Sequence, residues 1–194
     1  MKKDRYFQTL LEISMIRPIC RMGNPILREI AKEVKVSEII SDSFPQLILD
    51  LRDSMKHYGG IGIAAPQIGV SKQVCVIEMM GINRYGKEIN LPFTIFINPK
   101  VEVVNPKEEG YWEGCLSVPG LRGYVERPQH IRVHYLNENA EQKVLEAEGF
   151  LATVIQHELD HLFGVLYIDK IKDPTMLSYQ EEYDQFIQVP SIIE

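Results

Sequence analysis

The chain has 194 residues, of which 45% are hydrophobic and 25% are charged, and its formal net charge is −6 at pH 7. These values are ordinary for one globular domain, and the acidic balance argues against a DNA or general nucleic-acid binder, because no basic stripe is present to neutralise phosphates. The three cysteines lack the spacing of a secreted disulfide framework, and no apolar run approaches the roughly 20 residues that span a membrane.

Residues 1–14 differ from the rest of the chain. They carry both basic and acidic side chains and have no apolar core of the signal-peptide type, and Met15 is itself a plausible start site. We therefore expect an N-terminal extension over residues 1–14, which need not adopt an ordered structure, and a single domain over residues 15–194. The predicted location is a bacterial cytoplasm rather than an organelle.

The first predicted elements are helices. Asn24 followed by Pro25 is typical of a helix start, and a short helix through Lys32 is expected. Residues 42–57 place apolar side chains at helical spacing and predict a longer amphipathic helix that ends before two glycines. The stretch 60–67 is apolar and rich in glycine, so it is not expected to be a regular helix.

Strands are predicted next. The segments 73–79 and 93–98 are rich in β-branched residues, and 100–104 follows a proline. Residues 130–135 alternate between apolar and polar side chains, and a turn joins them to a partner strand at 143–147.

The last predicted elements are helices again. An apolar segment from Phe150 to Leu162 predicts a helix that ends at Gly164. Residues 166–168 are strand-like, and a final helix is expected from Asp173-Pro174 to about Gln188. The predicted fold class is α+β, with antiparallel sheets around a central metal-binding helix and helices near both ends of the chain.

The central helix carries the motif H-E-x-x-H at residues 157–161. Positions i and i+4 share one helix face, so the imidazoles of His157 and His161 can bind one metal ion. Glu158 lies beside them, where it can take a proton from a water on the metal. The motif predicts a metal hydrolase, and the alternative is a helix that merely happens to carry two histidines.

Two histidines do not complete such a site, and the residues alone leave the third ligand open. A further histidine on the H-E-x-x-H-x-x-G-x-x-H pattern is excluded because Tyr167 occupies its position. Glu181 on the last helix would give a peptidase of the thermolysin type. Cys115 follows Gly114 in a tight turn, although a lone cysteine is more often a small buried apolar residue.

Three segments together resemble the signature motifs of the peptide deformylase family. They are GIGIAAPQ at 60–67, EGCLS at 113–117 and QHELDH at 156–161, and they occur in that family's order and at similar spacings. The second motif looks like the type found in Gram-negative bacteria and organelles. The resemblance covers about residues 15–167 and implies a metal-dependent hydrolase that removes the N-formyl group from the N-terminal methionine of newly made polypeptides.

The resemblance also implies one divalent ion per chain, bound by Cys115, His157 and His161 with water or hydroxide in the fourth position. The usual physiological metal would be Fe²⁺, replaceable by Zn²⁺, Ni²⁺ or Co²⁺. A thiolate with two imidazoles suits such soft or borderline ions. The resulting positive charge lowers the pKa of bound water, to about 7 in well-studied zinc sites.

The resemblance assigns the remaining catalytic roles in the same way. Hydroxide attacks the formyl carbon, and Glu158 acts first as general base and then as general acid. The backbone N–H of Leu116 and the side-chain amide of Gln67 match the family's oxyanion hole. A non-catalytic relative that only binds metal or formyl peptides is the rival interpretation, and the intact Glu158 and Gln67 argue against it.

Substrate contacts follow from matched positions. Gly60, Ile61 and Gly62 are expected to pair with the peptide backbone as an added strand. An apolar pocket for the methionine is expected from Ile61, Phe150 and Val154. Gly114 and Arg122 match positions near the bound peptide.

Two further expectations concern charge. Asp160 lies on a mostly buried helix, where an unpaired carboxylate is costly, so we expect it to pair with Arg127. The family implies ribosome contact, but residues 180–185 are acidic, which argues against docking on rRNA through this tail. We interpret His57, His130 and His134 as ordinary surface residues.

Overall fold

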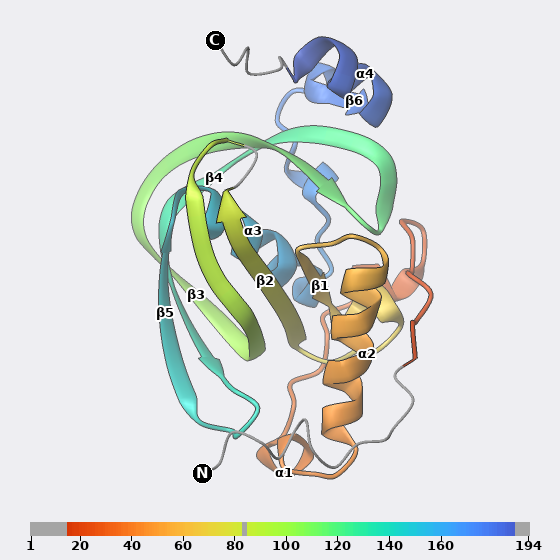
Figure 1. The fold of residues 1–194 in the computed structure, drawn as a ribbon, viewed down its shortest axis with the longest axis vertical. Helices are drawn as coiled ribbons and strands as arrows, with labels where there is room; N and C mark the ends of the chain where they lie inside the picture. Colours follow the sequence, from red (N-terminus) through yellow and green to blue (C-terminus); the bar gives the residue numbers. More distant parts are fainter. Residues whose placement is uncertain (1–14, 83–84, 189–194) are drawn as a thin grey trace.

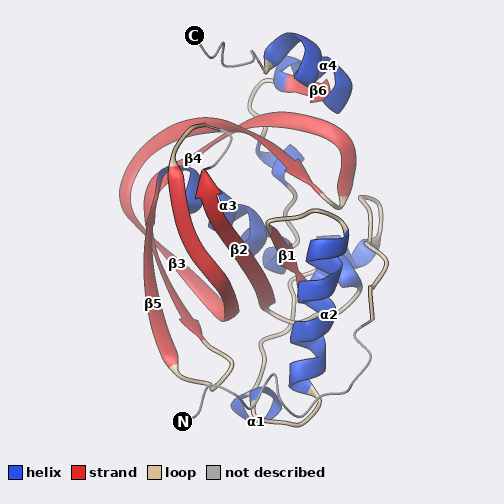
Figure 2. Ribbon diagram, viewed as in Figure 1, coloured by secondary structure: helices blue, strands red, loops and turns tan. Residues whose placement is uncertain are grey.

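The computed structural model describes residues 15–82 and 85–188, so the expected extension at 1–14 lies outside the described residues. Strands and helices combine in an α+β fold, which confirms the predicted class (Figures 1 and 2). The strands are β1 Gly62–Ala64, β2 Val74–Ile82, β3 Glu88–Cys115, β4 Val118–Leu136, β5 Gln142–Glu148 and β6 Leu177–Tyr179. The helical segments are η1 Pro25–Arg28, α1 Val36–Ile39, α2 Phe44–His57, η2 Ala65–Ile68, α3 Gly149–Asp160, η3 His161–Phe163, η4 Tyr167–Lys170, η5 Pro174–Met176, α4 Gln180–Glu182 and η6 Tyr183–Ile187.

These strands form one antiparallel sheet in the order β1-β2-β3-β4-β5, with β6 added to β4. Strand β2 is buried on both faces because its side chains alternate between two cores. Cys75 and Ile77 pack with α3 on one side, whereas Val74 and Val76 pack with α2 on the other. The sheet therefore lies between α2 and α3. None of the described helices is both long and apolar enough to cross a membrane.

Local signals in the first helices are confirmed with small shifts. The Asn24 side chain accepts a hydrogen bond from the backbone N–H of Ile26, but the helix that follows is a short 3-10 turn ending at Arg28 rather than Lys32. Helix α2 starts at Phe44, two positions after the expected start, and ends at His57 as expected. The short helix α1 was not predicted, because four residues are too few to show a helical period.

The two strands expected at 93–98 and 100–104 are one continuous strand, β3. Its pairing with β4 shifts register between Ile97 and Lys100, where Asn98 has a positive φ of 49° and Pro99 lacks an N–H to donate. The sequence break at the proline is therefore an irregularity inside a long strand. This strand carries the chain across the sheet and ends at Cys115.

The C-terminal expectations need correction. Residues 166–168, expected as a strand, lead into the 3-10 turn η4. The final helix does not run on from Pro174; the 3-10 turn η5 and strand β6 come first, and α-helical structure begins only at Gln180. The reason is tertiary: Leu177–Tyr179 finds backbone partners on β4 at Leu121–Gly123, which a sequence period cannot reveal.

Candidate active site

Two elements bring the predicted metal-binding residues together. Cys115 is the last residue of β3, in the turn that pairs it with Val118 of β4. His157 lies in the last turn of α3, and His161 begins η3 directly after it. The ligand atoms of the three side chains lie within 4.8 Å of one another, and Cys115 Sγ is 3.2 Å from His161 Nε2.

Charge couples these three groups. Burial raises the pKa of the Cys115 thiol, but the charges and hydrogen bonds of His161 and His157 outweigh it and hold that pKa well below its usual value. Burial lowers the pKa of His157, yet hydrogen bonds and charges of Cys115 and Glu113 raise it well above the usual value. The cluster therefore stabilises a thiolate, which is the form that binds metal.

The donor set fits a divalent metal ion. One sulfur and two imidazole nitrogens converge, and that combination suits zinc, iron and similar ions. Glu158 Oε2 and His161 Nδ1 are buried and have no hydrogen-bond partner in the described residues. A buried carboxylate oxygen beside three such donors needs a polar partner in the space between them, which a water on a metal would supply.

Glu158 lies against the edge strand β1. A Cβ added at Gly62 would lie 2.6 Å from Glu158 Oε1, so only glycine permits this approach. Burial raises the pKa of Glu158 to about 7, with His157 and His161 opposing the shift. A carboxyl with that pKa can exchange a proton near neutral pH.

A buried ionic network fixes His157, and sequence reasoning had assigned no role to its central residue, Glu113. Arg127 donates to both oxygens of Glu113, at 2.6 and 3.0 Å, and Glu113 Oε2 accepts from His157 Nδ1 at 2.7 Å. Arg127 also donates to Asp160 at 2.7 Å, which confirms the predicted pair. Because Nδ1 is engaged, the Nε2 of His157 is the nitrogen left for a metal.

The amide of Gln67 is held beside the cluster. The Ala64 N–H donates to Gln67 Oε1 at 2.8 Å, which orients Nε2 toward Ser117 Oγ at 3.2 Å and Cys115 Sγ at 3.5 Å. Leu116 follows Cys115, and its side chain packs against the core on the α2 side. Both residues line the same cleft as Cys115 and His157.

A cleft of about 330 Å³ opens above this group. A second hollow of about 50 Å³ adjoins it, next to His157 and Glu158. It is lined by the three residues expected for a methionine pocket and by Trp112, which sequence reasoning missed. The predicted residues on the cleft are Gly60, Ile61, Gly62, Gln67, Gly114, Cys115, Leu116, Arg122, His157 and Glu158, and those in the hollow include Ile61, Gly114, Phe150 and Val154.

Other candidates lie elsewhere. Glu181 is exposed on α4 and does not belong to the cluster of described side chains that could hold a metal ion. Tyr167 is buried, and its ring stacks on His157 with centroids 5.9 Å apart. Among the described residues, His57, His130 and His134 are likewise outside that group.

The sequence of this chain is similar to a known protein family and to individual proteins in it. Residues 16–176 match the model of a family described as polypeptide deformylase. A peptide deformylase of Leptospira biflexa is 46% identical over 170 residues, covering 87% of this chain and 95% of that protein. Peptide deformylase 1 of Bordetella pertussis is 42% identical over 167 residues, covering 86% and 94%.

Solved structures show the same similarity. A class I type b peptide deformylase from Acinetobacter baumannii, described as bound to Met-Ala-Ser, superposes with a TM-score of 0.78 at 34% identity. That match covers 82% of this chain and 100% of the other. A peptide deformylase from Thermotoga maritima gives a TM-score of 0.69 at 36% identity, covering 82% and 99%.

Proposed function

We propose a function from one premise: the chain belongs to the polypeptide deformylase family. Its reaction is hydrolysis of the formamide C–N bond at the N-terminal formylmethionine of newly made polypeptides, which yields formate and a free amine. The peptide described in the Acinetobacter baumannii relative, Met-Ala-Ser, is the kind of product that we assign to this chain.

The observation that carries the proposal is the convergence of Cys115, His157 and His161 beside the buried Glu158. The first three residues would hold one divalent ion, with Fe²⁺ as the physiological metal and Zn²⁺, Ni²⁺ or Co²⁺ as substitutes. When bound, the ion supplies a Lewis acid that polarises a carbonyl and makes a water more acidic.

Glu158 moves the proton. Its carboxylate takes a proton from the attacking water and delivers it to the amine nitrogen as the C–N bond breaks. Burial favours this cycle because the raised pKa, about 7, lets the same group accept and then release a proton near neutral pH.

Gln67 and Leu116 stabilise the charge that develops on the formyl oxygen. The Gln67 amide is held by the Ala64 N–H, so its Nε2 is a fixed donor at the cleft floor. The backbone N–H of Leu116 is the second proposed donor. Losing one such donor costs about 3–4 kcal/mol of transition-state stabilisation in comparable enzymes.

The peptide is positioned by the sheet edge and by the apolar hollow. Strand β1 lies at the end of the sheet order, and Ile61 uses its carbonyl to accept from the Glu78 N–H at 2.9 Å, on the side toward β2. The opposite side of this edge can pair with a peptide backbone. The methionine side chain would enter the hollow lined by Phe150 and Val154.

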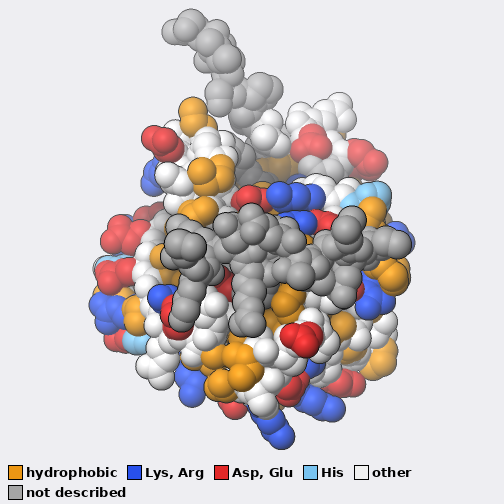
Figure 3. All heavy atoms as spheres, turned by 60° about the horizontal axis from the view of Figure 1, so that its bottom comes forward, with side chains coloured by type: hydrophobic (Ala, Val, Ile, Leu, Met, Phe, Trp, Pro, Cys, Tyr) orange, Lys and Arg blue, Asp and Glu red, His pale blue; other side chains and the backbone are white. Residues whose placement is uncertain are grey.

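We also propose that the protein acts in a bacterial cytoplasm on nascent peptides, without DNA or membrane partners. Basic and acidic side chains are interspersed on the face seen in Figure 3. Contact with the ribosome through residues 180–185 is not expected, because the acidic side chains there would be repelled by rRNA.

Formate release from formyl-Met-Ala-Ser by protein purified anaerobically with Fe²⁺ or Ni²⁺ tests the proposal. We expect turnover that is lost in Cys115→Ala together with the metal and retained in Glu181→Ala. Metal loss in Glu181→Ala but not in Cys115→Ala would favour a peptidase of the thermolysin type. Metal-loaded wild-type protein that releases no formate would contradict the proposed function.

A further inference from the structure

The C-terminal segment 177–187 lies beside the cleft, beyond the residues 16–176 that match the family. Its strand β6 pairs with β4 at Leu121–Gly123, the part of β4 that follows the Cys115 turn. Figure 1 shows the segment as the dark blue end of the described chain, next to the arch formed by β3 and β4. This position allows it to contribute to substrate binding.

One contact links this segment to the cleft. Arg122 Nε donates to Gln180 Oε1, and Gln180 Nε2 donates to Asp184 Oδ1 at 2.7 Å. Arg122 and Gln180 both line the cleft that contains Cys115 and Glu158. The Gln180 amide is therefore oriented by Asp184, and its oxygen is directed at the guanidinium.

The guanidinium is also held from its other side. A Cβ added at Gly114 would lie 2.1 Å from Arg122 Nη1 and 2.6 Å from Cζ, so the guanidinium rests directly on the backbone of Gly114. Gly114, expected from the sequence to contact substrate, is thus needed to make room for Arg122. Together Gly114 and Gln180 fix the position of one positive charge beside the reacting centre.

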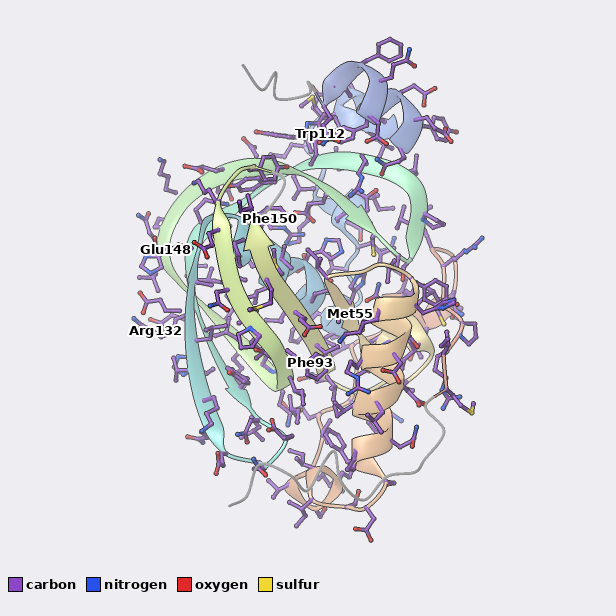
Figure 4. The ribbon with its side chains drawn as sticks, viewed as in Figure 1. Met55, Phe93, Trp112, Arg132, Glu148 and Phe150 are labelled. Atoms are coloured by element: carbon purple, nitrogen blue, oxygen red, sulfur yellow. The ribbon has the colours of Figure 1, made fainter. Side chains whose placement is uncertain are left out.

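A second contact links the segment to the apolar hollow. Tyr183 is 4% exposed, and its ring centroid lies 5.1 Å from that of Trp112, which lines the hollow with Phe150. Figure 4 shows Trp112 close to the C-terminal turn. The same segment therefore supports the expected methionine pocket and the outer cleft.

We propose that segment 177–187 is a wall of the peptide cleft and that Gln180 is a positioning residue, which holds Arg122 to bind peptide residues beyond the methionine. A guanidinium has N–H donors and no acceptor, so its partner on a peptide is an oxygen. The acceptor oxygen that every nascent chain offers, whatever its sequence, is a backbone carbonyl. The inference rests on the proposed deformylase function and adds recognition of peptide length.

The test compares formyl-Met, formyl-Met-Ala and formyl-Met-Ala-Ser, each as a C-terminal amide, with the metal-loaded full chain. Gln180→Ala should raise KM for the longest peptide about tenfold without changing kcat, and leave formyl-Met amide almost unaffected. The double variant Gln180→Glu with Asp184→Asn keeps an acceptor oxygen for Arg122 and a hydrogen bond between positions 180 and 184, so it should restore KM. Gln185→Ala, an exposed residue of the same segment, should behave as wild type.

Trp112 is the only tryptophan, so its fluorescence reports whether Tyr183 and the segment remain docked. If Gln180→Ala releases the segment, the emission shifts and KM should rise for all three substrates, because the methionine pocket loses its support, with the largest rise for the longest peptide, which also loses the contact to Arg122. An unchanged preference for longer peptides in Gln180→Ala, or an equal fall of kcat for all three substrates, overturns the inference. Wild-type protein that cleaves none of them contradicts the underlying deformylase function instead.

Discussion

Two of the arginines on strand β4, Arg127 and Arg132, meet the same kinds of partner in opposite surroundings. Arg127 and its partner Glu113 have side chains that are 3% and 4% exposed. Arg132 pairs with Glu102 and Glu146, and all three side chains are at least one-third exposed, as its place at the outer side of the sheet in Figure 4 also shows. Both groups also include histidine, so residue type does not distinguish them.

Strand alternation produces the difference. Arg127 shares the inward face of β4 with Val125 and Ile131, whereas Arg132 shares the outward face with His134. Inside, the charges are removed from water and hold His157 in one orientation. Outside, water screens the ion pairs, so they contribute little. Burial, rather than ion pairing itself, makes the inner network part of the proposed active site.

The largest expected effect separates the two arginines. Arg127→Ala leaves Glu113 and Asp160 without their buried cation and should lower the free energy of unfolding by about 3–5 kcal/mol. Arg132→Ala should lower it by less than about 1 kcal/mol. Urea unfolding of the metal-loaded proteins measures both. Equal losses in the two variants would show that burial does not separate the networks.

The pH dependence of the free energy of unfolding should reveal the raised pKa of the buried Glu158 carboxyl. Its folded pKa, about 7, exceeds the ordinary value of 4.5, so the unfolded chain loses this proton at lower pH than the folded chain. Its contribution is therefore present below pH 4.5 and is lost as pH rises through 7, a change on the order of 3 kcal/mol. Urea unfolding of metal-free protein at several pH values should show this slope, and Glu158→Gln should remove it. An unchanged slope in Glu158→Gln would contradict the assignment.

Of the two carboxylates Glu113 and Glu102, only the buried Glu113 should affect the affinity for the metal. Glu113→Gln weakens the hydrogen bond that orients His157, and loss of such partners typically costs about 10–100-fold in metal affinity. Glu102→Gln, its counterpart in the outer group, is the matched control and should leave affinity unchanged. Competition with a zinc chelator measures both dissociation constants, and an unchanged value for Glu113→Gln would count against this role.

Within the inner network, the smallest expected effect on stability is that of changing Asp160, which lies at its partly exposed border. Asp160 accepts from Arg127, and its side chain is 20% exposed, so water partly screens the pair. Asp160→Asn should lower the free energy of unfolding by about 1 kcal/mol or reduce metal retention. Thermal unfolding and metal analysis of the same samples check this, and wild-type values for both would contradict a role of the Asp160–Arg127 pair in stability or metal retention.

The sequence predicted what local spacing determines. The pair His157 and His161 requires only one continuous helical stretch, α3 followed by η3, and this stretch ends before Gly164, whose φ of 74° suits glycine. Cys115 could be included only through the combination of three motifs, because its distance from the histidines depends on the whole sheet. The expected pair Asp160–Arg127 came from the cost of burying a carboxylate and is confirmed.

What the sequence did not predict depends on strand register. Glu113 meets Arg127 across the paired strands β3 and β4, although the register places Glu109 opposite Arg127 and Glu113 opposite Gly123. Alternation shows which face a residue takes but not which residue lies opposite. The same limit explains why β6, which depends on a partner at Leu121–Gly123, was expected as helix.

The most direct test of the proposed active site is Glu158→Gln, with metal content and formate release from formyl-Met-Ala-Ser measured on the same preparation. The substitution keeps the size of the side chain and leaves Cys115, His157 and His161 intact. We expect one divalent ion per chain, as in wild type, and loss of formate release. Glu158→Gln protein that releases formate at the wild-type rate would contradict the role of Glu158 and the mechanism built on it.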